Sequence, residues 1–259
     1  MFGRHSATKK HRKKIKMIDY RKLRFNNLRS PEFSHLLLLL FWPIYGILFW
    51  AVERGFSGHG FYESYTPIYS PLDDLIPFCE IFVIPYYIWF AFIVGMLLYT
   101  MLFDAAAFRK MMWIVILTYS ATILVYLVFP NSQELRPDLD SLGRDNIFID
   151  IARNLYDFDT NTNVCPSIHV LGSMAVFMPS WNTKYMTSWW CRSVMFILNI
   201  LICFSTVFLK QHSIIDVVAS FVLCALVYPI VFWEKSPLNK KIIEKSAVHN
   251  KEKSEIAAI

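Results

Sequence analysis

The sequence predicts an all-α integral membrane protein, built as a bundle of six transmembrane helices. Hydrophobic residues make up 55% of the chain, aromatic residues 17%, and the mean hydropathy is +0.38. A chain with this composition is too apolar to be an ordinary soluble domain. The apolar residues form runs close to the roughly 20 residues that cross about 30 Å of hydrocarbon. The basic residues lie mostly outside these runs, near the two ends of the chain.

Six apolar runs are candidate spans. The first, residues 36–52, is longer than a signal-peptide core and has no small-residue cleavage site after it, so we interpret it as an uncleaved span. The others cover residues 81–103, 111–129, 166–181, 190–209 and 214–233. The chain therefore divides into a basic arm (residues 1–34), a six-span membrane domain (residues 35–233) and a charged tail (residues 234–259).

The charge distribution predicts the orientation in the membrane. The arm, the tail and the connections after the second and fourth spans are basic, whereas loops 53–74 and 130–165 are acidic. Because lysine and arginine favour the cytoplasmic side, we expect a multi-pass protein of the cell membrane with both termini in the cytoplasm. The net charge of +6 then needs no nucleic-acid partner, since the arm has almost no aromatic residues for stacking.

Several polar residues that ordinary loop surface does not explain are expected at the outer face. They occur in "LRP" of the third loop, in "CPSIHV" at the start of the fourth span, and in "STVFLKQHSIIDVV" between the fifth and sixth spans. The candidate site residues are Arg136, Ser167, His169, Lys210, His212 and Asp216.

The spacing of His212 and Asp216 suggests catalysis by an imidazole. Four residues apart, the two side chains lie on one helix face and can form a hydrogen bond. A carboxylate on one ring nitrogen fixes the tautomer and leaves the other nitrogen free to act as a nucleophile or base. His169, which has no carboxylate partner in the sequence pattern, can act as the acid.

The remaining candidate residues could bind an anion. Arg136, Lys210, the hydroxyl of Ser167 and the free N–H groups at the start of the fourth span would bind an oxyanion. Together with the histidines they suit phosphoryl transfer through a phosphohistidine. The five cysteines are scattered and no Cys/His cluster has metal-ligand spacing, so neither a metal nor a cofactor is expected.

Each of these features alone has a simpler explanation. Ser-x-His and His-x-x-x-Asp occur by chance in many chains, and serine is a common helix cap. Arg136 alone reads as a solvated loop residue, and Lys210 alone as a lysine at the membrane boundary. Their conjunction on one membrane face is what favours a site.

The order Arg-Pro, then Pro-Ser-x-His, then Ser-(x6)-His-x-x-x-Asp resembles the type 2 phosphatidic acid phosphatase superfamily. This superfamily includes lipid phosphate phosphatases, vanadium haloperoxidases and inositol phosphorylceramide synthase-type transferases. The motifs cover residues 135–216, and "LDDLIPFCEIFVIPYYIW" resembles the entry to the second span in one bacterial branch.

The resemblance implies a role for each matching residue. His212 would be the nucleophile, Asp216 would orient it, and His169 would protonate the leaving group. Ser167 and Arg136 would bind the phosphate.

Three positions depart from the family pattern. Phe129 stands where a lysine is expected, Ile168 replaces the glycine of Pro-Ser-Gly-His, and Thr206 replaces an arginine. Lys210 could substitute for one of the two missing cations. The pattern is closer to the branch with sphingolipid-type transferases.

We therefore expect a lipid phosphatase that hydrolyses a lipid phosphate or diphosphate at the outer face. The first alternative is a phospholipid or sphingolipid head-group phosphotransferase, because water and alcohol acceptors can use the same phosphohistidine. The second is an inactive membrane scaffold or a transporter, although a transporter typically has ionisable groups near the midplane or repeated halves. The expected partners are a lipid phosphate and membrane lipids, and no pattern identifies a protein partner.

Overall fold

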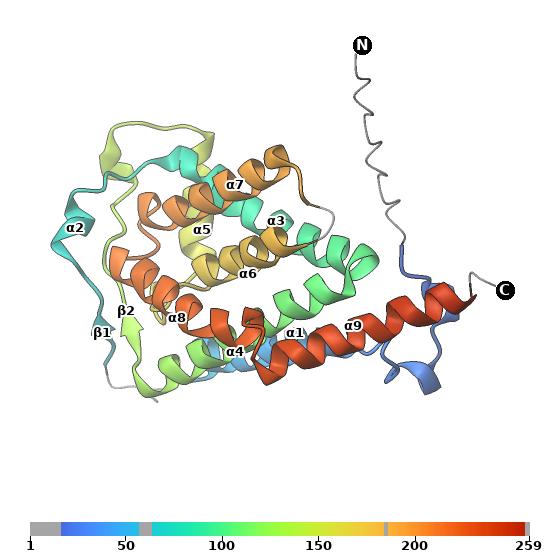
Figure 1. Cartoon of the computed structure of the whole chain (residues 1–259). Coiled ribbons are helices and arrows are strands. Elements are labelled where there is room, and N and C mark those ends of the chain that lie inside the picture. Colours follow the sequence, from blue (N-terminus) through green and yellow to red (C-terminus); the bar gives the residue numbers. More distant parts are fainter. Residues whose placement is uncertain (1–16, 57–63, 184–185, 257–259) are drawn as a thin grey trace, which may run out of the picture.

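The computed structural model describes residues 17–56, 64–183 and 186–256, without the side chains of residues 54–56 and 247–256. Most of the basic arm, residues 1–16, lies outside the described residues. The chain is largely helical (Figure 1). The helices are α1 (Phe41–Trp50), α2 (Pro71–Asp74), α3 (Val83–Phe103), α4 (Ala105–Val128), α5 (Ile147–Phe158), α6 (Ile168–Asn182), α7 (Trp189–Phe208), α8 (Ile214–Phe232) and α9 (Pro237–Ile256). Two short strands, β1 (Thr66–Pro67) and β2 (Asn131–Ser132), pair in parallel.

In the described part of the chain, five helical segments are long and apolar enough to cross a membrane. They are Leu36–Glu53, Glu80–Phe103, Ala105–Val128, Trp189–Phe208 and Ile214–Phe232. These segments agree with the first, second, third, fifth and sixth predicted spans, and they indicate a multi-pass membrane protein. The predicted fourth span is α6, which has 15 residues. At 1.5 Å per residue, α6 is about 22 Å long, which is less than the hydrocarbon thickness.

Helix α6 lies at the centre of the bundle, where α3, α4, α7 and α8 pack around it. Small and apolar side chains make this burial possible. A Cβ atom at Gly172 would lie 2.6 Å from Tyr119 Oη, 2.7 Å from Ile93 Cδ1 and 2.9 Å from Trp89 Nε1. Glycine therefore allows α6 to approach α3 and α4 closely.

The connection between α3 and α4 is a single residue, Asp104. Its Oδ1 accepts a hydrogen bond from Ala107 N at 3.1 Å, which caps α4. Its Oδ2 accepts one from Thr183 Oγ1 at 2.7 Å. One carboxylate thus starts α4 and ties it to the segment after α6.

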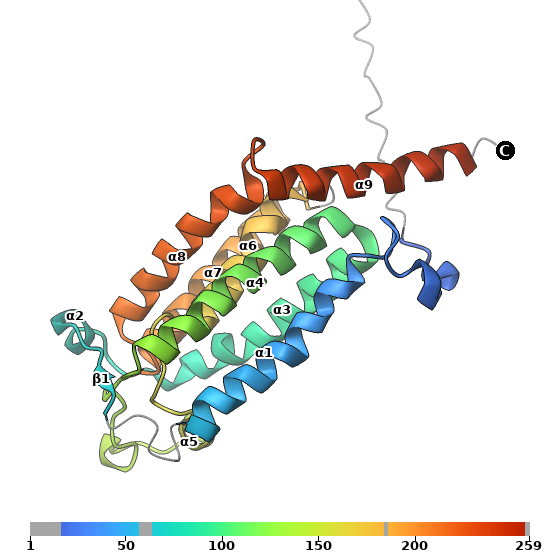
Figure 2. The same cartoon turned by 90° about the horizontal axis from the view of Figure 1, so that it is seen from below.

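The described part of the basic arm and helix α9 lie at one end of the bundle (Figure 2). Ile18 and Phe33 are buried, and Ile18 N donates to Leu102 O at 2.8 Å. Ile18 and Phe33 thus hold this segment against the bundle, whereas Phe25 between them is fully exposed. The tail forms α9, which lies against α4 and α8.

The opposite end carries α2, α5 and the two strands (Figure 2). Helix α5 lies within the long acidic loop, which was not expected to contain a helix. Asn146 caps it through hydrogen bonds from the backbone N–H groups of Phe148 and Ile149. Tyr156 Oη donates to Leu209 O at 2.7 Å, which ties α5 to the turn between α7 and α8. This turn carries His212, so α5 helps to close the end of the bundle where the candidate site lies.

Candidate active site

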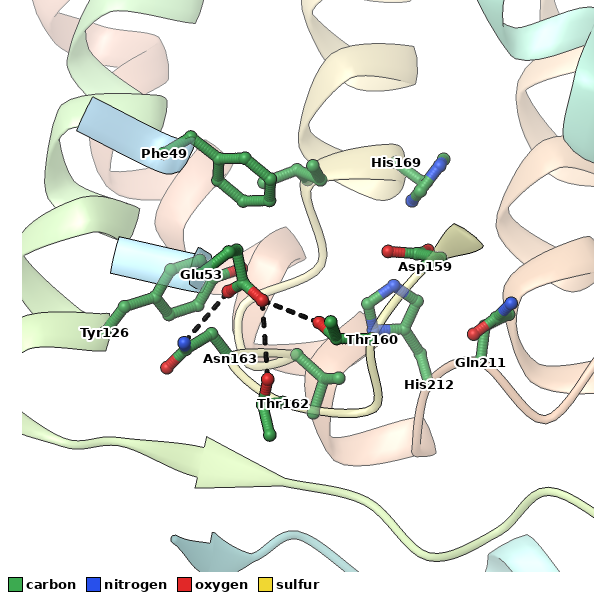
Figure 3. Close-up of a pocket in the computed structure, with 12 residues that line it drawn as sticks. Phe49, Glu53, Tyr126, Asp159, Thr160, Thr162, Asn163, His169, Gln211 and His212 are labelled. Carbon is green, nitrogen blue, oxygen red and sulfur yellow. Dashed lines mark hydrogen bonds between the residues drawn. The ribbon is translucent and has the colours of Figure 1, made fainter. Parts of the chain in front are cut away.

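A small cavity of about 30 Å³ lies at this end of the bundle (Figure 3). His169, on the first turn of α6, and His212, just before α8, both line it. The other lining residues are Phe49, Glu53, Tyr126, Asp159, Thr160, Thr162, Asn163, Val164, Ile168 and Gln211. The two histidines, 43 positions apart in the sequence, are therefore brought together by the packing of α6 against α8.

His212 has the carboxylate partner that its spacing predicts. Its Nδ1 lies 3.2 Å from Asp216 Oδ2, and both side chains are buried. A carboxylate only accepts hydrogen bonds at neutral pH, so Nδ1 carries the proton and Nε2 keeps its lone pair. Asp216 Oδ2 also accepts from Ser213 N at 3.0 Å. The backbone N–H of Ser213, at the start of α8, thus holds the Asp216 carboxylate in place beside His212.

A second carboxylate, Asp73 of α2, holds the start of α8 from outside. Its Oδ2 accepts from Ser213 Oγ at 2.6 Å and its Oδ1 accepts from Ile214 N at 2.8 Å. Ser70 N donates to the same carboxylate at 2.8 Å, so α2 is capped by it as well. Asp73 is only 2% exposed. The pattern Ser-x-x-Asp in "SPLDD" is a capping signature, but its second role on α8 has no signal in the sequence.

His169 has a different environment. Its ring lies against two aromatic side chains of α3, with centroids 4.3 Å from Tyr86 and 4.4 Å from Trp89. The His169 and His212 ring centroids are 5.9 Å apart. His169 Nδ1 is buried and has no hydrogen-bond partner among the described residues. The aromatic rings therefore fix the imidazole plane, and in the described part of the chain no hydrogen bond between Nδ1 and a carboxylate fixes its tautomer.

Ser167 does not line the cavity. It is the N-cap of α6, where its Oγ accepts from Val170 N at 3.5 Å. Its own N–H donates to Ser220 Oγ at 2.9 Å, and its carbonyl accepts from the same hydroxyl at 3.2 Å. The structure thus places Ser167 as a link between α6 and α8.

Arg136 lies behind the cavity wall. Its Nη1 donates to Tyr156 O at 3.1 Å, and its Nη2 donates to Asp159 O at 3.0 Å and Thr160 O at 2.9 Å. The same Nη2 also donates to Gln211 Oε1. The guanidinium is therefore bound to main-chain carbonyls and one side-chain amide, and not turned into the cavity.

Lys210 points toward α2. Its Nζ donates to the carbonyl oxygen of Asp73 at 2.6 Å. Burial lowers the pKa of Lys210, and the charges of Asp73 and Asp74 oppose this shift. Lys210 does not line the cavity. Of the six residues predicted for the site, the structure brings His169, His212 and Asp216 together and leaves Arg136, Ser167 and Lys210 in the surrounding scaffold.

Two carboxylates that the sequence did not single out line the cavity. Figure 3 draws the Asp159 carboxylate between the two histidine rings. Asp159 Oδ2 accepts from Tyr86 Oη at 3.1 Å. Burial raises the pKa of Asp159, and the interactions with His212, Tyr86 and Arg136 lower it. Asp159 is one of many acidic residues in its loop, so composition gave no reason to select it.

Glu53 reaches the cavity from the segment after α1. Its carboxylate accepts from Thr160 Oγ1 at 2.6 Å, from Asn163 Nδ2 at 2.9 Å and from Thr162 Oγ1 at 3.3 Å (Figure 3). These contacts bind the loop before α6 to the end of the first span. A single carboxylate at the end of an apolar run was a usable signal, because such a group is rarely buried without partners.

The arrangement can perform acid–base and nucleophilic chemistry with two imidazoles in one buried cavity. No group of three or more His, Cys, Asp or Glu side chains among the described residues is arranged to hold a metal ion. Comparisons with models of protein families, with curated proteins and with solved structures found no match for this chain.

Proposed function

We propose that the protein is an integral membrane enzyme that hydrolyses a lipid phosphate or diphosphate through a phosphohistidine intermediate. The observation that carries the proposal is the pair of histidines in one cavity: His212 Nδ1 lies 3.2 Å from Asp216 Oδ2, whereas His169 Nδ1 has no hydrogen-bond partner among the described residues. This asymmetry supports two different roles for the same residue type. The residue order that resembles the type 2 phosphatidic acid phosphatase superfamily supports the same chemistry.

In the proposed first step, His212 Nε2 attacks the phosphorus atom. The nitrogen–phosphorus bond forms as the bond from phosphorus to the lipid oxygen breaks, and His169 gives its proton to that oxygen. Asp216 holds the Nδ1 proton and stabilises the positive charge that develops on the ring. In the second step water gives a proton to His169 and the water oxygen attacks phosphorus while the nitrogen–phosphorus bond breaks. This releases phosphate, frees His212 and returns His169 to its protonated form.

The proposed membrane arrangement places α6 as a sixth, central helix and the site at the outer face of the cell membrane. The arm and α9 would lie on the cytoplasmic side, so both termini would be inside the cell. This proposal is supported by the charge pattern, because the described part of the basic arm and α9 lie at the end of the bundle opposite to the site (Figure 2).

A second candidate function is transfer of a phosphate-linked head group from a phospholipid to an alcohol. The charge of the cavity favours it. Glu53 and Asp159 line the cavity, and no Lys or Arg is among its lining residues in the described part of the chain. A doubly charged phosphomonoester is repelled by carboxylates more strongly than a singly charged phosphodiester is. With a phosphodiester substrate, the acceptor pocket would decide whether water or an alcohol attacks the phosphohistidine.

The test is to trap the intermediate. Purified protein in detergent is mixed with a lipid carrying ³²P in its phosphate group, in the presence of EDTA, and quenched in alkali. We expect a labelled protein band that is stable to alkali and labile to acid, as phosphohistidine is. The band is expected to be lost in His212→Ala and, in a parallel reaction without EDTA, to be blocked by orthovanadate. A strict requirement for a divalent ion, or no labelled band with phosphatidic acid, an isoprenyl diphosphate, a lysolipid phosphate or a phosphodiester lipid, would overturn the proposal.

A further inference from the structure

Helix α5 is amphipathic, and only part of its apolar face is buried. The buried part packs against the first turns of α3 and consists of Ile149, Ala152 and Leu155. Two large apolar side chains of the same helix, Ile147 and Phe158, are 67% and 79% exposed. At 3.6 residues per turn, Ile147, Ile151 and Phe158 lie within about 40° of one another around the helix. These three residues form an apolar stripe along one side of α5.

A polar face lies beside the apolar stripe. Asp150, Asn154 and Asp157 on this face are exposed, and Arg153 forms an ion pair with Asp140 at 2.8 Å. A helix with an exposed apolar stripe next to a charged face is typical of helices that lie in the interface of a membrane.

The ends of α5 show that it lies across one end of the bundle. At its start, the N-cap Asn146 donates from Nδ2 to Glu80 Oε1 at 3.1 Å, where the second span begins. Near its end, Tyr156 Oη donates to the carbonyl oxygen of Leu209, just after the fifth span. Cys79 N donates to Phe208 O at 3.0 Å, so these two span ends lie side by side. With 12 residues, α5 is about 18 Å long, which is too short to cross the hydrocarbon.

The apolar stripe continues the surface that a span presents to lipid. Ile151 and the first turns of α3 enclose an open groove of about 560 Å³, whose lining residues are Val83, Ile84, Tyr87, Ile88, Ala91 and Ile151. Helix α3 belongs to the apolar segment Glu80–Phe103, and Ile84, Tyr87 and Ile88 are exposed on its side away from the bundle. A surface of this kind in a membrane span is in contact with acyl chains. The groove thus joins the exposed part of α5 to a lipid-facing surface.

We infer that α5 lies in the membrane interface at the end of the bundle that carries the site, with its apolar stripe against the acyl chains of the bilayer and one chain in the groove. The inference goes beyond the proposed function and does not depend on the reaction. It assigns part of the acidic loop 130–165 to the membrane surface. Phe158 directly precedes Asp159, which lines the cavity, so lipid contact at Phe158 would hold one wall of the cavity at that surface.

The test measures the contact of each face of α5 with acyl chains. Single cysteines are placed in a full chain whose five native cysteines are replaced by alanine, and each is labelled with an environment-sensitive fluorophore. Ile147→Cys and Phe158→Cys place the label on the apolar stripe. Asp150→Cys and Asp157→Cys are the matched controls on the polar face of the same helix. The proteins are reconstituted into phosphatidylcholine vesicles in which part of the lipid carries bromine on its acyl chains, because bromine quenches a fluorophore on contact.

We expect the labels at residues 147 and 158 to emit at shorter wavelength and to lose fluorescence as the share of brominated lipid rises. The labels at residues 150 and 157 should emit as a label in water does and keep their fluorescence. The faces of a helix are separated by about 10 Å, which is about the depth to which interfacial helices insert. Equal quenching at all four positions would overturn the inference. Absence of quenching at residues 147 and 158 would also overturn it, because protein or water, and not lipid, would then cover the apolar stripe.

A second measurement keeps the native cysteines, in case the cysteine-free chain does not unfold cooperatively. Phe158→p-benzoylphenylalanine replaces one aromatic side chain by a photoreactive one, and Asp157→p-benzoylphenylalanine is its control. Irradiation in vesicles should attach phospholipid to the chain at residue 158 and not at residue 157, which the mass of the protein reports. Attachment to the same extent at both positions, or none at residue 158, would contradict the proposed orientation of α5.

Discussion

The start of α6 and the start of α8 are built alike but surround their histidines differently. Each helix begins at a serine N-cap, Ser167 for α6 and Ser213 for α8. Each carries a histidine within two residues of that cap, His169 after Ser167 and His212 before Ser213. The capped helix start brings both imidazoles to the same end of the bundle.

The neighbours of the two imidazoles differ. His212 has Asp216 on its ring, and Asp73 clamps the main chain beside it. His169 has the rings of Tyr86 and Trp89 on its faces and an unpaired buried Nδ1 among the described residues. A helix start can thus position an imidazole, but the residues that pack around it decide which proton it holds. The following experiments test this difference.

The largest effect is expected from loss of the histidine with the carboxylate. In the proposed mechanism, His212→Ala removes the nitrogen that forms the bond to phosphorus, so no substrate can avoid the loss. Hydrolysis of both a lipid phosphate and p-nitrophenyl phosphate should fall to background. Thermal unfolding in detergent checks that the variant is folded. Substantial activity on the substrate with the good leaving group would mean that His212 is not the nucleophile.

His169→Ala is expected to have a large effect that depends on the substrate. A general acid typically contributes about 10²–10⁴-fold when the leaving oxygen is a poor leaving group. Loss of His169 should therefore remove most activity on a lipid phosphate, and leave a larger fraction on p-nitrophenyl phosphate if dephosphorylation is not limiting. The measurement is the ratio of variant to wild-type rates on the two substrates. Equal fractional losses on both would remove the proposed difference between the histidines.

A smaller effect is expected from Asp73→Ala, because Asp73 is a positioning residue for α8. The variant loses the acceptor for Ser213 Oγ and Ile214 N, and misplacing a catalytic group by about 1 Å can cost up to about 100-fold in rate. The fractional loss of rate should be the same on a lipid phosphate and on p-nitrophenyl phosphate, as is expected for His212. Asp73→Asn should restore part of the lost rate.

Asp74→Asn is the matched control for Asp73, since Asp74 is the next residue, is exposed, and bonds Tyr69 Oη. If the control lowers kcat as much as Asp73→Ala does, or if Asp73→Ala shows the substrate dependence expected of His169, Asp73 does not act through His212.

The smallest effect is expected on stability, from the carboxylate drawn between the two histidines. Burial raises the pKa of Asp159 above the value of about 3.9 for an unfolded chain. The folded state therefore binds this proton more tightly, and stability is lost as pH rises from about 4 to the folded-state pKa. A pKa difference of one corresponds to about 1.4 kcal/mol.

As pH rises through this range, the unfolding midpoint of Asp159→Asn should therefore rise relative to that of the wild type. Unfolding in detergent at a series of pH values measures the difference, with the exposed Asp157→Asn on α5 as control. A difference between Asp159→Asn and wild type that does not change with pH would contradict the expectation.

The sequence determined the features that depend on local periodicity. Five of the six predicted spans appear as long apolar helices, because length and hydropathy are properties of a continuous segment. The contact between His212 and Asp216 follows from four-residue spacing on one helix. The remaining predicted span, the fourth, is α6, which has the predicted position but is shorter than a span and lies at the centre of the bundle.

Only the tertiary structure decided which side chains line the cavity. Arg136 and Lys210 carry the expected charge, but nearby carbonyl oxygens compete for their donors and hold them in the scaffold. The contact of Asp73 with the start of α8, and the place of Asp159 and Gln211 in the cavity, had no signal in the sequence. The physical reason is that a buried donor or acceptor takes whichever partner the fold brings within about 3 Å. Spacing along the chain predicts that partner within one helix, but not between segments that meet only when the chain folds.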